Sequence, residues 1–202
     1  MLFKTPAPSE KFLMSKIKGL QKSGHEVILF VNKNDNFNLC EVVEFPLISN
    51  FFLFQILKML MAYFKLIIRS PMTTINFLKL EKLDGKSIRH CLENLYINST
   101  ILSKDLDWLH FCFTTTTFRK ENIAKSINAK MGVSLRGYDI NVYPLKNHNC
   151  YSLLLQKVDK VHSISYSLLK KAEKYGLNNS VKKEVIFPAV NTKIFKNQRP
   201  SK

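Results

Sequence analysis

From residue 105 onward, short apolar runs alternate with amphipathic stretches. The runs have the length of strands, about 4–7 residues, and the stretches have the length of short helices. This alternation is typical of βαβ units, in which helices cover both faces of a parallel sheet. Val27–Val31 is continuously apolar and mostly β-branched or aromatic, as expected for a strand buried on both faces. We therefore predict an α/β domain with a Rossmann-like, three-layer α/β/α architecture and a mainly parallel sheet.

Local signals predict the boundaries of the elements. Ser9 is a suitable N-cap for a helix over about 10–22, and Gly24 is its expected stop. Ser165 is likewise expected to cap a helix that ends at Gly176. The other helices are predicted at 51–69, in parts of 72–104, at 118–131 with Gly132 as the stop, and at 150–158. The other strands are predicted at 39–45, 107–113, 133–136, 160–164 and 184–187.

The chain is strongly basic, with 31 Lys and Arg against 15 Asp and Glu and a net charge of +16. Such a charge favours anionic partners, which include nucleic acids, acidic lipid headgroups and phosphorylated small molecules. No nucleic-acid-binding pattern accompanies it, and the basic residues are spread along the chain, so no nucleic acid is expected. The four cysteines form no C-x-x-C pair. They are expected to be reduced thiols of a cytosolic protein without a metal site.

The predicted helix over 51–69 has one broad face of large apolar residues. Lys58, Lys65 and Arg69 lie on the other face. Spanning a bilayer is disfavoured, because each lysine would cost about 2.5–3.5 kcal/mol at its centre. Two interpretations stay open: a core helix with a cationic solvent face, or a peripheral contact with an anionic membrane surface. Met1 runs directly into Lys4 and prolines, so no signal peptide is expected, which indicates a cytoplasmic protein. If the helix over 51–69 contacts a membrane, the protein is expected to be peripheral on the inner face of the cytoplasmic membrane.

Polar residues follow the predicted strands at one edge of the sheet. In open parallel sheets, ligands bind beyond the carboxyl ends of the strands, where the strand order reverses. The candidates are Ser9 and Glu10, the segment 110–117, and the loop with Arg136, Gly137 and Asp139. We expect them to converge on one cleft. A glycine-rich phosphate-binding fingerprint is absent from the sequence.

Five segments, in the same order, resemble motifs of bacterial glycosyltransferase family 4, in the branch that builds exopolysaccharide, capsule and colanic acid. Residues 8–12 and 24–27 resemble its opening "P-x-SETF … GHEV". Residues 107–111 and 134–139 resemble its "D-x-x-H-x-HF" and "S-[FH]-[HR]-G-x-D" motifs. Residues 159–165 and 186–195 match its later "D-x-[IV]-x-x-[VI]-S" and "V-I-P-x-[GA]-[VI]-[DN] … F" blocks.

The resemblance implies one half of a GT-B fold, in which two Rossmann-like domains face each other. Residues 1–196 correspond to the N-terminal, acceptor-binding domain, and 197–202 to the start of the interdomain linker. The C-terminal donor-binding domain, with its "E-x7-E" carboxylates, has no counterpart in the chain. The complete enzyme would transfer a sugar from a UDP- or GDP-sugar to a cell-surface polysaccharide or lipid-linked oligosaccharide precursor, without a metal. This domain alone would hold no cofactor and be inactive.

The resemblance also implies roles for particular residues. Ser9 and Glu10 are expected to line the acceptor cleft, although an N-cap and a first-turn acid account for them equally well. His110 is expected to position or deprotonate an acceptor hydroxyl, or else to be a structural histidine. Gly137 is expected to supply a positive φ or a close backbone approach.

Arg136 has the arginine alternative of its motif, whereas many family members carry histidine at this position. Arginine stays protonated and cannot act as a base, whereas its planar fork suits a phosphate or carboxylate. The catalytic candidates are His110, through its imidazole, and Arg136, through the binding of anionic charge. The structural alternative for Arg136 is an ion pair with Asp139. Asp139 either contacts a sugar hydroxyl or holds its loop. Two other functions stay open: a stand-alone flavodoxin-like small-molecule binder and, less favoured, a basic nucleic-acid-binding module.

Overall fold

The strands form two parallel sheets in the computed structural model, which describes residues 1–7 and 10–188. The smaller sheet pairs β1 (Ile28–Val31) with β2 (Glu41–Glu44). The larger sheet has the order β3-β4-β5-β6, and every pair in it is parallel. Its strands are β3 (Trp108–Phe111), β4 (Lys130–Leu135), β5 (Lys160–Ser163) and β6 (Lys182–Val185). The predicted α/β class with a parallel sheet is confirmed.

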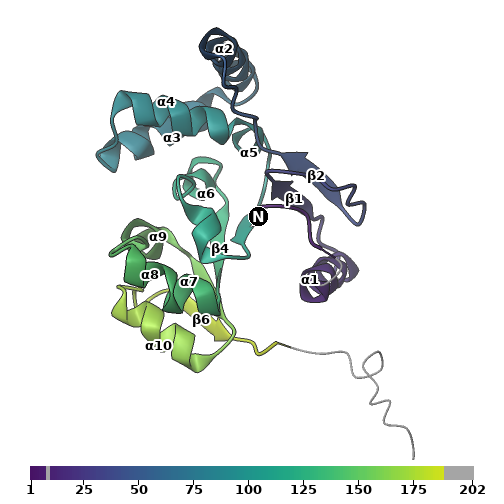
Figure 1. The fold of residues 1–202 in the computed structure, drawn as a ribbon, viewed down its shortest axis with the longest axis vertical. Helices are drawn as coiled ribbons and strands as arrows, with labels where there is room; N and C mark the ends of the chain where they lie inside the picture. The colour runs from purple at the N-terminus through teal and green to yellow at the C-terminus, as the bar shows by residue number, and fades with distance from the viewer. Residues whose placement is uncertain (8–9, 189–202) are drawn as a thin grey trace, which may run out of the picture.

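Residues 1–5 connect the two sheets (Figure 1). The backbone N–H of Leu2 donates to the carbonyl of Phe30 at 3.1 Å, next to β1. On the other side, the carbonyl of Met1 accepts from the N–H of Cys112 at 3.3 Å, at the end of β3. The strand-like order is thus β2-β1-(1–5)-β3-β4-β5-β6. This is a doubly wound arrangement whose order reverses between residues 1–5 and β3.

The helices lie on both faces of this sheet. Figure 1 shows α1 (Lys11–Lys22) on one face and α3, α6, α9 and α10 on the other. Besides α1, the helical elements are α2 (Phe52–Arg69), α3 (Pro71–Leu83), α4 (Ile88–Ile97), α5 (Ser99–Leu102), the 3₁₀ helix η1 (Thr114–Thr117), α6 (Ile123–Ser126), α7 (Gly137–Asn141), α8 (Tyr143–Lys146), α9 (Ser152–Lys157) and α10 (Tyr166–Lys174).

Two apolar clusters hold the layers together. The larger one contains Phe30 and the fully buried Phe111, beneath the helices that follow β2. The smaller one contains Leu29, Val31 and Cys112 and lies beneath α1. Since Leu29 and Val31 point to one face and Phe30 to the other, β1 is buried on both faces, as its apolar run predicts. Cys112 packs there as a small apolar side chain.

Several local signals act as predicted. Gly24 follows α1 with φ +84°, and Gly176 follows α10 with φ +100°, a backbone region that glycine enters without strain. The Ser165 hydroxyl accepts from the N–H of Leu168 at 3.3 Å and caps α10. The N-cap of α1 is Glu10 rather than Ser9, one residue later than predicted, and Ser9 itself lies outside the described residues.

The predicted helix over 118–131 is wrong for most of its length. Only 123–126 are α-helical, and β4 begins at Lys130, three residues before the predicted strand. Pairing with β3 explains the difference, because Lys130 N–H donates to Asp107 O at 2.9 Å and Gly132 lies opposite His110. Gly132 is therefore a strand residue and not a helix stop. A Cβ at this position would lie 2.9 Å from Nδ1 of His110, so the strand needs glycine there.

α2 is attached to the protein by the face opposite to the one that a core helix would bury. Leu66 is its only fully buried residue, and Ala62 and Tyr63 beside it are half-buried. The large apolar side chains point away from the protein, with Leu60 58% and Phe64 67% exposed. The interpretation of 51–69 as a core helix is therefore wrong. In residues 1–7 and 10–188, no helix has the length and apolar character to cross a membrane.

Candidate functional site

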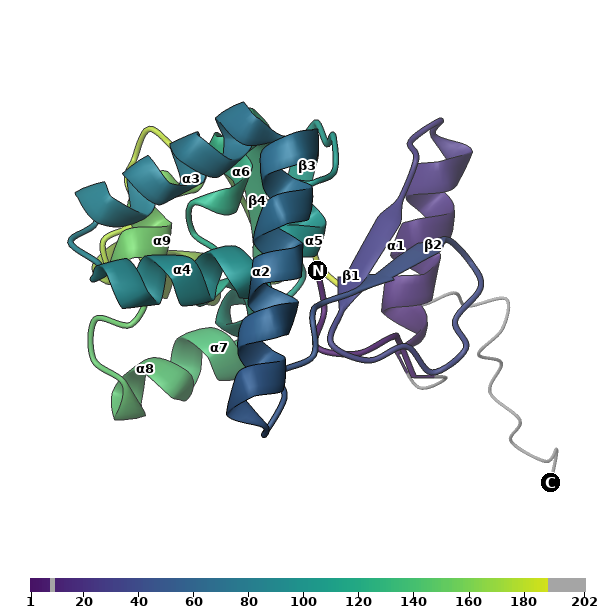
Figure 2. The ribbon, with the colours of Figure 1, turned by 90° about the horizontal axis from the view of Figure 1, so that it is seen from above.

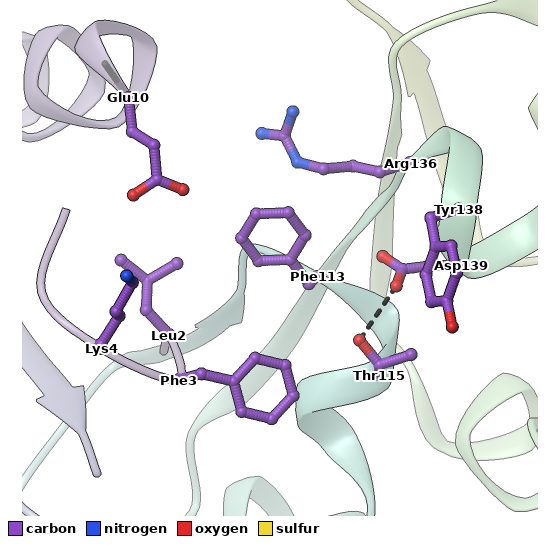
Figure 3. A pocket seen from close by; sticks show the side chains of 9 residues that line it. All are labelled: Leu2, Phe3, Lys4, Glu10, Phe113, Thr115, Arg136, Tyr138 and Asp139. Carbon is purple, nitrogen blue, oxygen red and sulfur yellow. Dashed lines mark hydrogen bonds between the residues drawn. The ribbon is translucent and has the colours of Figure 1, made fainter. Parts of the chain in front are cut away.

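A cavity of about 350 Å³ lies where the strand order reverses. Its wall comes from the three places at which ligands meet doubly wound sheets: the N-terminal strand-like segment, the loop after β3 and the residues after β4 (Figure 3). The lining residues are Leu2, Phe3, Lys4, Glu10, Phe113, Thr115, Arg136, Tyr138 and Asp139. The predicted convergence on one cleft thus brings together Glu10, Arg136 and Asp139.

Arg136 is held rigidly at the edge of this cavity. Its Nε donates to the carbonyl of Cys112 at 3.0 Å. Its guanidinium carbon lies 4.3 Å from the ring centroid of Phe12 and 5.1 Å from that of Phe113. Burial lowers the pKa of Arg136 from its usual value, yet a guanidinium stays charged at neutral pH. Stacking on two rings leaves the terminal nitrogens directed along the cavity wall, where they can meet an anion (Figure 3).

Asp139 is buried and is held by hydrogen bonds from the loop after β3. The N–H of Thr114 donates to its carboxylate at 3.0 Å, and the hydroxyl of Thr115 donates at 2.9 Å. Burial raises the pKa of Asp139, and these hydrogen bonds oppose the shift. Within the described residues, no ion pair joins Asp139 to Arg136. Asp139 therefore ties α7 to η1 through hydrogen bonds, and it does not form an ion pair with Arg136.

Glu10, Lys4 and Tyr138 complete the polar part of the wall. One carboxylate oxygen of Glu10 accepts from the N–H of Ala7 at 2.9 Å, which links residue 7 to the start of α1. Glu10 faces Arg136 across the cavity in Figure 3. Tyr138 is 62% exposed, so one face of its ring is open to a ligand. The cavity thus offers a fixed cation, two carboxylates and an exposed aromatic ring.

Gly137 does not have the expected role. It begins α7 instead of lying in a loop, and it does not have a positive φ. A Cβ added at Gly137 would meet no atom within 4 Å, so no close backbone approach requires glycine. Ser9 lies outside the described residues, as do 189–202, which include the end of the last family-like block and the expected linker at 197–202.

The structure places His110 beneath α1 and away from the cavity wall. Its Nε2 lies 2.8 Å from Nζ of Lys16 and 2.9 Å from Oγ of Ser134. The Ser134 hydroxyl is in turn 3.0 Å from Nδ1 of His162, so the contacts cross β3, β4 and β5. Burial, reinforced by the Lys16 ammonium, holds the pKa of His110 well below its usual value. The ring is neutral at pH 7, and its Nε2 is already occupied.

Four lining residues are absent from the sequence-based candidates: Leu2, Phe3, Lys4 and Tyr138. Tyr138 lies between two residues that were chosen, so its position in the motif was a usable signal. Leu2, Phe3 and Lys4 belong to the segment 1–5, which is too short to show a strand pattern. Its place in the sheet depends on pairing with β1 and β3, which the sequence does not reveal.

The lining of the cavity combines carboxylates with a guanidinium, two kinds of group that interact with polar ligands in different ways. Carboxylates accept hydrogen bonds from hydroxyls, and a guanidinium fork binds phosphate or carboxylate. In the part of the chain that the structure describes, no three His, Cys, Asp or Glu side chains gather as metal ligands. Comparisons of the chain with family models, with characterised proteins and with solved structures find no match.

Proposed function

We propose that the chain is the acceptor-binding half of a glycosyltransferase. The enzyme would transfer a sugar from a nucleotide-sugar to a cell-surface polysaccharide or lipid-linked oligosaccharide precursor. One observation carries the proposal: Glu10, from the first family-like segment, and Arg136 and Asp139, from a much later one, line the same cavity. Two stretches chosen for their resemblance to one family thus meet at the place where doubly wound domains bind ligands.

The proposal gives a task to three of the lining residues, Arg136, Glu10 and Tyr138. Arg136 binds a phosphate or pyrophosphate group of the acceptor. Its guanidinium is held in place by the rings of Phe12 and Phe113, and it forms no ion pair with Asp139. Glu10 accepts from sugar hydroxyls. Tyr138 offers its exposed ring to the apolar face of a sugar.

Catalysis is not assigned to a base in this chain. Arg136 cannot take a proton, and Nε2 of His110 is engaged by Lys16 and Ser134. The role of Arg136 is then electrostatic: it holds anionic charge near the reacting groups. A second, donor-binding domain would supply the UDP- or GDP-sugar and the remaining groups.

The second candidate is a stand-alone binder of a small phosphorylated molecule. It is favoured by the position of the cavity, where the strand order reverses, because single doubly wound domains bind ligands at this point. The coding sequence beyond Lys202 separates the two candidates. A second domain with an "E-x7-E" pair is expected under the first candidate, and a stop codon in an intact gene is expected under the second.

Calorimetric titration tests the site itself. We expect glucose 1-phosphate to bind more tightly than glucose and more tightly than UDP-glucose. Arg136→Ala should weaken the binding of the phosphate about 10- to 100-fold, because a charge-assisted hydrogen-bonding partner is lost. Arg136→Lys, which keeps the charge but not the fork, should fall between the two.

Arg89→Ala is the matched control, because the Arg89 side chain is 87% exposed and its ion-pair partner Glu93 lies outside the cavity wall. It should leave the affinity unchanged. An Arg136→Ala protein that folds and binds glucose 1-phosphate like the wild type would refute the anion-binding role. Tight binding of UDP-glucose would show that the chain is a donor-binding half instead.

A further inference from the structure

The outward face of α2 consists of large apolar side chains that are exposed to solvent. We define the α2 apolar face as Leu53, Leu57, Leu60, Phe64, Ile67 and Ile68. Every one of these side chains is at least half exposed, and Leu53 reaches 81%. They recur at three- and four-residue steps, so they form one continuous stripe along the helix. A contiguous apolar stripe of this kind marks an interaction surface.

The opposite face of α2 is fixed to the protein, so the helix cannot roll to hide the stripe. Leu66, on this opposite face, is only 1% exposed. The hydroxyl of Tyr63 donates to the carbonyl of Leu92 in α4 at 2.8 Å. Figure 2 shows α2 lying along the outside of the molecule, against the other helices on that side. Turning the stripe inward would break these contacts and expose Leu66 in its place.

Positive charge borders the stripe along one side. Lys58, Lys65 and Arg69 follow one another there, and α2 contains no Asp or Glu. Lys65 and Arg69 are exposed, whereas Lys58 is half-buried with Nζ 4.9 Å from the centroid of the Phe54 ring. An apolar stripe edged by cations is complementary to a surface that is apolar within and anionic outside.

The beginning of α2 lies at the same edge of the sheet as the cavity. α2 follows the carboxyl end of β2, just as α7 follows that of β4, and the first turn of α2 and the helix α7 both lie in the lower part of Figure 2. This end is rich in exposed aromatic rings, with Phe51 79% and Phe52 75% exposed. Amphipathic helices that lie in a membrane interface carry such residues on their apolar face.

We propose that the α2 apolar face docks onto an anionic lipid bilayer. The helix lies in the plane of the interface, with its stripe among the acyl chains and Lys65 and Arg69 at the headgroups. A second copy of the chain is a poorer partner, because each copy has a net charge of +16 and the two would repel each other. The proposal does not rest on the sugar site, although a docked α2 would place the cavity edge close to the membrane.

Vesicle co-sedimentation of the whole chain tests the proposal. We expect binding to phosphatidylcholine vesicles that contain a one-third share of phosphatidylglycerol, and much weaker binding to phosphatidylcholine alone. Added salt should weaken the binding to the anionic vesicles. Replacing Lys65 and Arg69 together by Gln should reduce the affinity about thirtyfold, because each basic residue near the surface contributes on the order of 1 kcal/mol.

Lys18 and Lys22 provide the matched control, since both are exposed on α1, on the other face of the sheet. Their double replacement by Gln removes the same charge and should change the affinity far less. For the stripe, Leu60→Ser with Phe64→Ser should reduce binding at least about tenfold. Leu83→Ser with Ile88→Ser, equally exposed positions outside α2, should not. Circular dichroism would confirm that every variant is folded.

Three results would overturn the proposal. The first is that the chain binds anionic vesicles no more tightly than neutral ones, or binds neither. The second is an equal loss in the α1 and α2 charge variants, which would indicate attraction by net charge alone. The third is a dimer in solution that Leu60→Ser with Phe64→Ser dissociates, which would make the stripe an interface between copies.

Discussion

α10 and α2 are both amphipathic helices, and they meet the protein with opposite faces. α10 buries Leu168 and Ala172 against the sheet and leaves Lys170 and Lys174 outside. α2 keeps its largest apolar side chains outside and is attached through Leu66 and a few polar contacts. A helical pattern therefore defines two faces without stating which one meets the core. The neighbours decide, and where the apolar face is left over, it is available for binding.

The largest expected effect separates the two helices directly. Leu168→Ala should lower the free energy of unfolding by about 2–5 kcal/mol, because the side chain is 4% exposed and a cavity would replace it. Leu60→Ala in α2 should change it by less than about 0.5 kcal/mol, since that side chain already faces solvent. Urea unfolding followed by circular dichroism measures both. Equal losses in the two variants would mean that the stripe of α2 is covered in solution.

A second, smaller effect tests how tightly the sheet is packed on the α1 side. Gly132→Ala should lower the free energy of unfolding by about 1–3 kcal/mol, because the new Cβ would lie 2.9 Å from the ring of His110. Gly19→Ala, in α1 with no atom within 4 Å of the new Cβ, should raise it by about 0.5–1 kcal/mol through helix propensity. The same urea titrations apply. A neutral Gly132→Ala would show that His110 moves freely.

The smallest expected effect concerns the attachment of α2. Tyr63→Phe removes the hydrogen bond to Leu92 and should lower the free energy of unfolding by about 1 kcal/mol. Burial, with the charge of Glu93, raises the pKa of Tyr63 from 10.0 to about 12. The folded state therefore keeps the Tyr63 proton up to a higher pH than the unfolded state does. The stabilisation should be constant below pH 10 and decline as the pH rises through about 12. A difference from Tyr63→Phe that stays the same across this range would contradict the shift.

The sequence predicts the fold best where one residue acts on its own neighbours. Gly24 and Gly176 end helices through their own backbone conformation, and Ser165 caps α10 through an N–H three residues away. The predicted helix over 118–131 fails because its last residues pair with β3, and no local propensity contains that contact. Gly132 had the appearance of a helix stop for the same reason.

The candidate site follows the same division. Glu10, Arg136 and Asp139 could be chosen because polar residues at the carboxyl ends of parallel strands share one edge of the sheet. His110 occupies such a strand as well, but its side chain points under α1 to Lys16, and a short strand does not reveal in advance which face a residue takes. The stacking of Arg136 between two rings depends on Phe12, which comes from a distant helix.

The seating of residues 1–5 in the sheet has a consequence for the order of folding. Their neighbour on one side, β1, is synthesised soon after them. On the other side, the amino group of Met1 donates to the carbonyl of His110, which lies 109 residues further along the chain. On the ribosome, the strand in the middle of the sheet must therefore wait with one edge unpaired until β3 emerges. Contacts of such long sequence separation slow folding, so we expect the joining of the two sheets to be a late event.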